Sequence, residues 1–132
     1  MAAAAAVTTA ACGSSDADVT TSPGATSGPV TVALAERVVL GLCQLERDVE
    51  HGDRGAAEAT FLDRSHDGLH AIAGALEGVD RSAAGDVLVS KQVVEQAFVS
   101  DELPTAGQVA TLLSAARRGL ALLDLPTPQC SR

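Results

Sequence analysis

Aromatic residues are almost absent from this 132-residue sequence, which contains no Trp, no Tyr and two Phe, Phe61 and Phe98. Base stacking, aromatic platforms for sugars and large pockets lined by aromatic rings therefore lack the residues they require. Basic residues are also scarce, since 9 Lys and Arg stand against 17 Asp and Glu and give a formal net charge of −8. Nucleic-acid binding needs a basic face that displaces counterions, so the sequence excludes DNA and RNA as partners.

Catalytic motifs are missing as well. The sequence contains no GxSxG elbow, glycine-rich phosphate loop, CxxC pair, HExxH helix or EF-hand loop, and no Glu-x-x-His pairs of the kind found in di-iron bundles. No uninterrupted apolar run reaches the roughly 18 residues that a membrane-spanning helix requires. These absences predict that the chain is not an enzyme and that it does not cross a membrane by itself.

Small aliphatic residues are what the chain has in quantity, and 46% of its residues are hydrophobic. At this length the composition predicts one domain with an aliphatic core. The first 29 residues differ from the rest, because residues 2–11 are small and mostly apolar and residues 13–29 are mainly Ser, Thr, Gly, Pro and Asp. The second of these stretches has too little to bury to offset the entropy of ordering it. We therefore expect a flexible tether up to Pro29 and a folded domain over residues 30–132.

The order of features around Cys12 resembles the export signal of bacterial lipoproteins. Ala10 and Ala11 precede the cysteine, and Gly13 opens the polar stretch that follows it. The resemblance implies that the Cys12 sulfur carries a diacylglyceryl group, that the signal is cleaved just before it, and that the domain is anchored to the outside of the cytoplasmic membrane. The segment departs from the pattern in having no Lys or Arg before Cys12. The alternative is a cytosolic protein with a disordered, Ala-rich tail.

The two remaining cysteines are an even number, as an oxidising compartment predicts if Cys12 carries lipid. Cys130 lies in the sequence LPTPQCSR, where two prolines favour an extended tail. Six extended residues after Asp124 span about 20 Å, and Cys43 lies about 18 Å along the first predicted helix. A disulfide between Cys43 and Cys130 would then hold the tail against the bundle. Two unrelated free thiols are the alternative.

Apolar residues at helical spacing divide the folded part into four segments of about twenty residues. Gly52 with Asp53 separates the first from the second, Asp80 or Ser82 opens the third, and Thr105 with Gln108 forms a capping box for the fourth. Short connections favour antiparallel neighbours, so we predict an all-α, up-down-up-down four-helix bundle. A three-helix arrangement and a dimer of hairpins stay open. The residues expected on the core faces are Leu34, Val38, Leu42, Leu45 and Val49; Leu62, Leu69, Ile72, Leu76 and Val79; Val87, Leu88, Val94 and Phe98; and Val109, Leu112, Leu113, Ala116, Leu120 and Leu123.

One polar stripe on the second segment has the residue types of a metal site. At 100° per residue, Asp63, His66 and His70 share one side of the helix, and two histidines four residues apart can present both rings to one ion. Glu46 on the first segment lies level with this region in a tight hairpin. These residues predict a zinc or copper site, while the competing interpretation is an ordinary polar flank of an amphipathic helix with surface hydrogen-bonded pairs.

Two functions are consistent with these patterns. The first is a membrane-tethered, non-catalytic interaction or scaffold module, anchored through Cys12 and with a protein partner that the sequence does not identify. The second is a metal-ion-binding lipoprotein that uses the His and carboxylate cluster.

Overall fold

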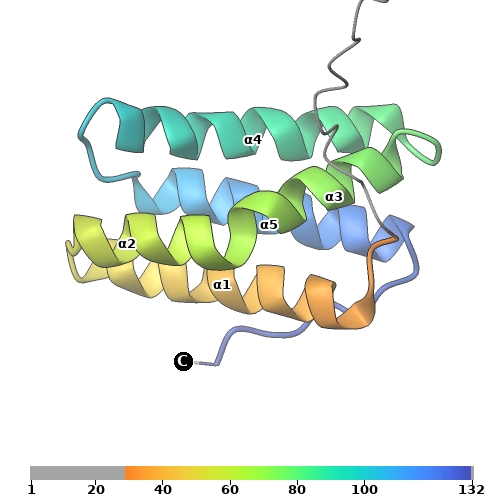
Figure 1. Cartoon of the computed structure of the whole chain (residues 1–132), viewed down its shortest axis with the longest axis horizontal. Helices are drawn as coiled ribbons and strands as arrows, with labels where there is room; N and C mark the ends of the chain where they lie inside the picture. The colour runs from red at the N-terminus through yellow and green to blue at the C-terminus, as the bar shows by residue number, and fades with distance from the viewer. Residues whose placement is uncertain (1–28, 132) are drawn as a thin grey trace, which may run out of the picture.

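The computed structural model describes residues 29–131, and all its regular elements are helices. They are α1 (Val32–Glu50), α2 (Arg54–Thr60), the π-helix η1 (Phe61–His66), α3 (Asp67–Leu76), α4 (Arg81–Val99) and α5 (Ala106–Leu122). Because α2, η1 and α3 follow one another without a break, they form one bent rod, and the rods lie side by side as a four-helix bundle (Figure 1). The predicted all-α bundle is confirmed. Cys12 and all of the expected tether except Pro29 lie outside the described residues.

Side-chain caps begin each of the four rods. Thr31, Asp53, Asp80 and Thr105 each accept a hydrogen bond from the backbone N–H three residues later. The capping box is present in full, since the Gln108 side chain also accepts from the Thr105 N–H at 2.8 Å. Such caps satisfy backbone donors that would otherwise be left unpaired at the first turn of a helix. The helix starts are therefore encoded locally, and those of the second, third and fourth rods were predicted from the sequence.

The π-helix in the second rod was not predicted, and it changes which side chains face the core. A π-helix has more residues per turn than an α-helix, so it rotates the residues within it relative to the expected stripe. Phe61 and Ser65 are fully buried, whereas Leu62, expected in the core, is 52% exposed. The Ser65 hydroxyl donates to the Val38 carbonyl at 3.3 Å, and Arg37 donates to the Asp63 carbonyl. These two bonds from α1 satisfy polar groups of the irregular segment.

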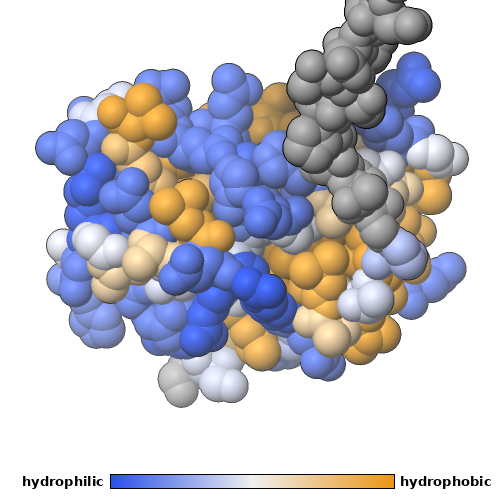
Figure 2. All heavy atoms as spheres, viewed as in Figure 1, coloured by the Kyte–Doolittle hydropathy of each residue, from blue (hydrophilic) through white to orange (hydrophobic). Residues whose placement is uncertain are grey.

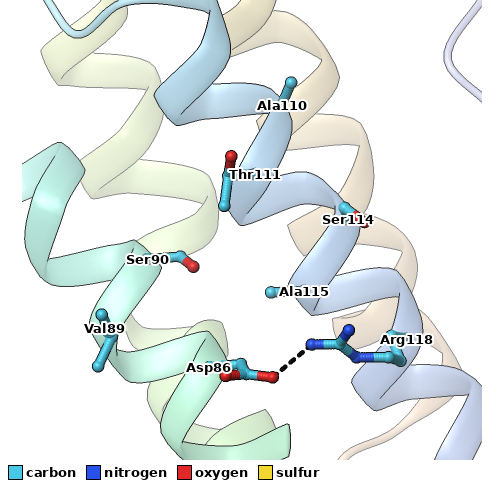
Figure 3. Close-up of a pocket in the computed structure, with 8 residues that line it drawn as sticks. All are labelled: Asp86, Val89, Ser90, Ala110, Thr111, Ser114, Ala115 and Arg118. Atoms are coloured by element: carbon cyan, nitrogen blue, oxygen red, sulfur yellow. Dashed lines mark hydrogen bonds and ion pairs between the residues drawn. The ribbon is translucent and has the colours of Figure 1, made fainter.

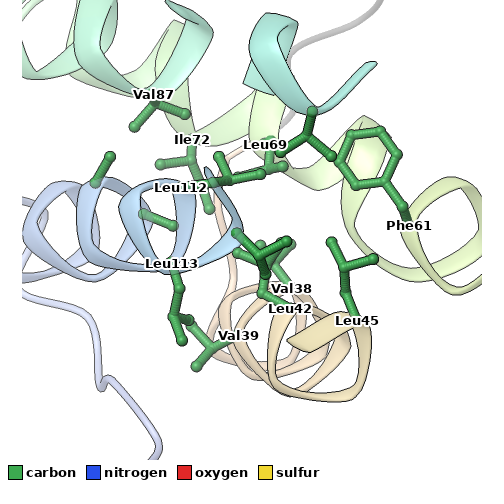
Figure 4. Close-up of a cluster of buried hydrophobic side chains, with 14 of the residues drawn as sticks. Val38, Val39, Leu42, Leu45, Phe61, Leu69, Ile72, Val87, Leu112 and Leu113 are labelled. Atoms are coloured by element: carbon green, nitrogen blue, oxygen red, sulfur yellow. The ribbon is translucent and has the colours of Figure 1, made fainter. Parts of the chain in front are cut away.

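Two other core predictions were wrong. Val79 lies in the turn after α3 and is exposed, because the helix ends at Leu76. Leu88 is exposed because Lys91 shares the inward stripe of α4 with Val87 and Val94. Leu34 and Leu123 are half-buried and pack against the core. The buried residues that were predicted are Val38, Leu42, Leu45, Val49, Leu69, Ile72, Leu76, Val87, Val94, Phe98, Val109, Leu112, Leu113, Ala116 and Leu120 (Figure 4).

Glycines allow three close approaches between rods. A Cβ on Gly68 would lie 2.2 Å from Val38 Cγ2, and one on Gly41 would lie 2.5 Å from Ser65 Oγ. On α5, a Cβ on Gly119 would lie 2.7 Å from a Leu76 methyl carbon. Distances this short are not tolerated between real side chains, so the packing of α1 on η1 and α3 depends on the missing side chains.

The C-terminal tail folds back along α1 and is joined to it by a disulfide between Cys43 and Cys130 (Figure 1). The two Cα atoms are 5.4 Å apart, and 87 positions separate the cysteines in the sequence. The Arg47 guanidinium donates to the Ser131 carbonyl at 3.2 Å, and Arg117 donates to the Pro128 carbonyl at 3.1 Å. The predicted disulfide is therefore present in the structure, with hydrogen bonds on both sides of it. Among the helices of residues 29–131, none has the length and apolar content needed to span a membrane.

Candidate functional site

A cluster of charged and titratable side chains lies where η1 and α3 meet α4. His66 closes the π-helix, His70 follows one turn later on α3, and Lys91 and Glu95 face them from α4. His66 Nε2 lies 2.8 Å from Glu95 Oε1, and His66 Nδ1 lies 2.9 Å from an oxygen of Asp67. The ring centroids of His66 and His70 are 5.2 Å apart. We call these five residues the His–Lys cluster.

Lys91 is the unusual member of this cluster, because lysine is normally exposed and Lys91 is only 3% exposed. A buried ammonium is costly unless a counter-charge lies close to it. Its Nζ donates to Glu95 Oε1, the same oxygen that His66 Nε2 approaches. Glu95 therefore links the buried cation of α4 to the imidazole of the second rod.

The charges of the cluster shift three pKa values in the same direction. Burial, together with the nearby positive charges of Lys91 and His66, lowers the pKa of His70 below 6.5. Partial desolvation of Glu95 opposes its ionisation, but the hydrogen bond from Lys91 and the charges of Lys91 and His66 prevail and lower its pKa below 4.5. The hydrogen bond with His66 lowers the pKa of Asp67, whose side chain is almost fully exposed. The cluster thus favours a neutral His70 beside an ionised Glu95.

The residues predicted to bind a metal are only partly brought together. His66 and His70 are neighbours, but Asp63 lies by Leu34 and Arg37 on the side towards α1. Glu46 lines a separate cleft beside the C-terminal tail. In the part of the chain that the structure describes, no three His, Cys, Asp or Glu residues are grouped so that they could hold a metal ion. The physical reason is the π-helix, which removes the 100° spacing on which the predicted stripe depended. The zinc or copper site stays a prediction, and Lys91 adds a positive charge close to the histidine pair.

The cleft that contains Glu46 lies between α1, α5 and the C-terminal tail and has a volume of about 1010 Å³. Its walls mix cations with anions, with Arg47 and Arg117 beside Glu46 and Glu50. Arg117 Nη2 also lies 3.4 Å from Cys130 Sγ, and both arginines donate to carbonyls of the tail. The two arginines of this cleft therefore hold the tail in place.

A furrow follows the contact between α4 and α5 (Figure 3). Two adjoining hollows of about 540 and 360 Å³ share Val89, Ser90 and Thr111 as lining residues, so they form one continuous surface feature. Val89 and Val93 project from α4 along the furrow and are 63% and 41% exposed. The α5 side is shallow because its exposed residues are small. They are Ala106, Gly107, Ala110, Thr111 and Ser114.

Exposed charges are missing from most of this surface. Between Val87 and Ser100 the charged residues of α4 are Lys91, which is buried, and Glu95, which points to His66. Between residues 105 and 116 of α5 there is no charged residue at all. Only the Asp86–Arg118 ion pair lies at one end of the furrow (Figure 3). We call this surface, from Asp86 to Val93 on α4 and from Gly107 to Arg118 on α5, the α4–α5 face.

The side of the bundle shown in Figure 2 differs in composition from the α4–α5 face. Hydrophilic residues form a band over the middle of this side, and apolar residues gather over the N-terminal part of α1. Val32 and Leu40 of α1 are among the exposed aliphatic residues. In a chain with a net charge of −8, a helical face on which Asp86, paired with Arg118, is the one exposed acidic residue is the exception.

No protein-family model matches this sequence, and no curated protein or solved structure shows a significant match to it.

Lys91 and Glu95 were missed by the sequence analysis, although one signal for Lys91 was present. The spacing of Ala84, Val87, Lys91, Val94 and Phe98 follows steps of three and four, which places Lys91 on the core stripe. The usual exposure of lysine outweighed that periodicity. The signal for the α4–α5 face was the uncharged composition of the outward positions on both helices.

Proposed function

We propose that this protein is a membrane-tethered, non-catalytic interaction module that works outside the cytoplasm. The observation that carries the proposal is the α4–α5 face, because a surface with exposed valines and no exposed charge along most of its length has the composition of the centre of a protein interface. Charged residues are depleted at such centres, since each would have to lose its hydration on binding.

The proposed location is supported by the disulfide. Disulfides persist in oxidising compartments and are rare in the reducing cytosol. In the disulfide, the sulfur of Cys43 is not a free thiol and does not act as a nucleophile. The tether with Cys12 fits the same location, because a lipid on that sulfur would hold the domain at the outer surface of the membrane.

The anchor is tested by mass spectrometry of the protein purified from the membranes of the organism that makes it. We expect an N-terminus at Cys12 that carries the added mass of a diacylglyceryl group. A Cys12→Ser variant serves as the control and should lose its membrane association. Protein recovered with an intact, unmodified Met1 would contradict the anchor.

The interaction face is tested by site-specific photocrosslinking in the same cells. A photoreactive phenylalanine analogue replaces Val89 on the α4–α5 face or Leu40 on the outer side of α1, where the native side chain is 44% exposed. We expect defined crosslinked species from position 89 and none from position 40. Crosslinks that are absent from both positions, or equal at both, would contradict the proposal.

A further inference from the structure

We infer that the α4–α5 face binds a second copy of this chain, in a two-fold symmetric dimer; this rests on the interaction function proposed above and names its partner. A two-fold axis requires one surface to be complementary to itself. The α4–α5 face meets this requirement because it carries both a ridge, Val89 and Val93, and a neighbouring furrow lined by Ala110 and Ser114. Each copy can place its ridge in the furrow of the other.

The register of the pairing follows from the positions on α4. If the axis passes near Lys91 and the two α4 helices run antiparallel, Val89 lies opposite the partner's Val93, and Val93 lies opposite the partner's Val89. This pairing brings aliphatic side chains together at the centre of the interface.

Electrostatics select the occupant. Two copies that each carry a net charge of −8 repel each other, and they approach most easily through a face on which Asp86, neutralised by its ion pair with Arg118, is the one exposed acidic residue. A strongly basic partner would instead be attracted to the acidic surfaces elsewhere on the molecule. The α4–α5 face therefore favours an uncharged helical surface, and the same face of a second copy provides one.

The available area sets the strength of association. The α5 part of the face, Gly107 to Arg118, is about 18 Å long, and two helices side by side are about 20 Å wide. The face is thus about 360 Å² per copy, or about 720 Å² in total, which is below the standard size of specific interfaces and suits a weak, transient association. We expect a reversible dimer with a Kd between about 1 and 100 μM rather than a permanent one. Tethering to a membrane would favour such a weak dimer, because both copies are confined to one surface.

The test is sedimentation velocity over about 1 to 500 μM, on the disulfide-intact full chain with Cys12→Ser so that no free thiol can link two copies. We expect a concentration-dependent shift from monomer to dimer. Val89→Glu should weaken the association at least about 100-fold, because each dimer would bury two unpaired carboxylates. The matched control, Leu40→Glu, introduces the same charge at another exposed aliphatic site and should leave the Kd unchanged. Far-UV circular dichroism verifies that both variants are folded.

Two results would overturn the inference. One is a wild-type chain that stays monomeric throughout this range, and the other is a dimer that Val89→Glu does not weaken. The cellular crosslink at position 89 separates this failure from failure of the proposed function. An adduct with twice the mass of the chain supports the dimer, whereas an adduct with another protein alone retains an interaction function and refutes self-association.

Discussion

The disulfide between Cys43 and Cys130 closes a loop that contains most of the folded domain, and its removal should cost a large part of the stability. With 87 positions between the cysteines, the chain-entropy relation gives a loss of about 15 cal/mol/K in the unfolded state, or about 4.6 kcal/mol at 25 °C. Domains of this size are stable by about 5 to 15 kcal/mol in total. The cross-link therefore contributes at least about a third of this stability, mainly by restricting the unfolded chain.

Cys130→Ala is the cleanest way to remove the bond. Cys130 is half-buried, whereas Cys43 is 2% exposed and would remain as a small apolar residue in the core. We expect the free energy of unfolding to fall by about 4 kcal/mol. The urea m-value should also rise, because a chain without the cross-link exposes more surface when it unfolds.

The assay is urea unfolding followed by circular dichroism at 222 nm, since the chain has no Trp or Tyr to report by fluorescence. All proteins carry Cys12→Ser, so that no cysteine remains outside the pair Cys43 and Cys130. Reductant should bring the parent protein to the stability of Cys130→Ala and should leave that variant unchanged. Ser131→Ala, which keeps both the bond and the backbone acceptor of residue 131, should stay within about 0.5 kcal/mol of the parent. A loss below about 1 kcal/mol with an unchanged m-value would refute the loop-entropy reasoning.

Further predictions concern packing and protonation. Gly68→Ala should destabilise the fold by about 1 to 3 kcal/mol, because its Cβ would meet Val38. At Gly85 an added Cβ would meet no atom within 4 Å, so Gly85→Ala should stabilise α4 by up to about 1 kcal/mol. Equal effects of the two substitutions in urea unfolding would contradict the packing argument. The pKa of His70 is lowered, so its share of the stability is complete above about pH 6.5 and is lost as the pH falls below that value, where the unfolded chain takes up a proton first. The lowered pKa of Glu95 adds stability that is complete above about pH 4.5 and disappears as the pH falls through its folded-state pKa. The free energy of unfolding, measured from pH 8 to 3, should therefore decline in two stages. A flat profile would exclude both contributions. Lys91→Met should change the free energy of unfolding at pH 7 by less than about 1 kcal/mol. It should also weaken the decline caused by Glu95, because it removes the cation that holds Glu95 ionised. A loss above about 3 kcal/mol at pH 7 would show that the buried ion pair stabilises the fold.

Features set by neighbouring residues could be predicted from the sequence. The caps at Asp53, Asp80 and Thr105 depend on hydrogen bonds that reach three positions along the chain, so residue type and spacing in the sequence reveal them directly. The disulfide was predictable for another reason, since the reach of an extended tail and the rise of a helix fix how far Cys130 can travel along α1.

Features set by contact between rods were beyond a single sequence. The π-helix forms where Ser65 comes against Gly41 and bonds the Val38 carbonyl, a contact between residues more than twenty positions apart. Once the helical repeat changes there, an angular argument that runs from Asp63 through His66 loses its basis. The periodicity of α4 places Lys91 on the core stripe, but it cannot report that Glu95 and His66 meet beside it across two rods.

The two sulfurs of the disulfide differ in a way that governs its lifetime. Cys130 is the more open of the two to an incoming thiolate, and attack there must expel the thiolate of Cys43, which is 2% exposed and packs in the apolar core, where a negative charge is poorly stabilised. The cation of Arg117 lies at Cys130 instead, so it would stabilise a departing thiolate only when a reagent attacks the less exposed Cys43. The bond is thus kinetically shielded against thiol exchange, and small reductants should open it slowly until the helices around Cys43 loosen.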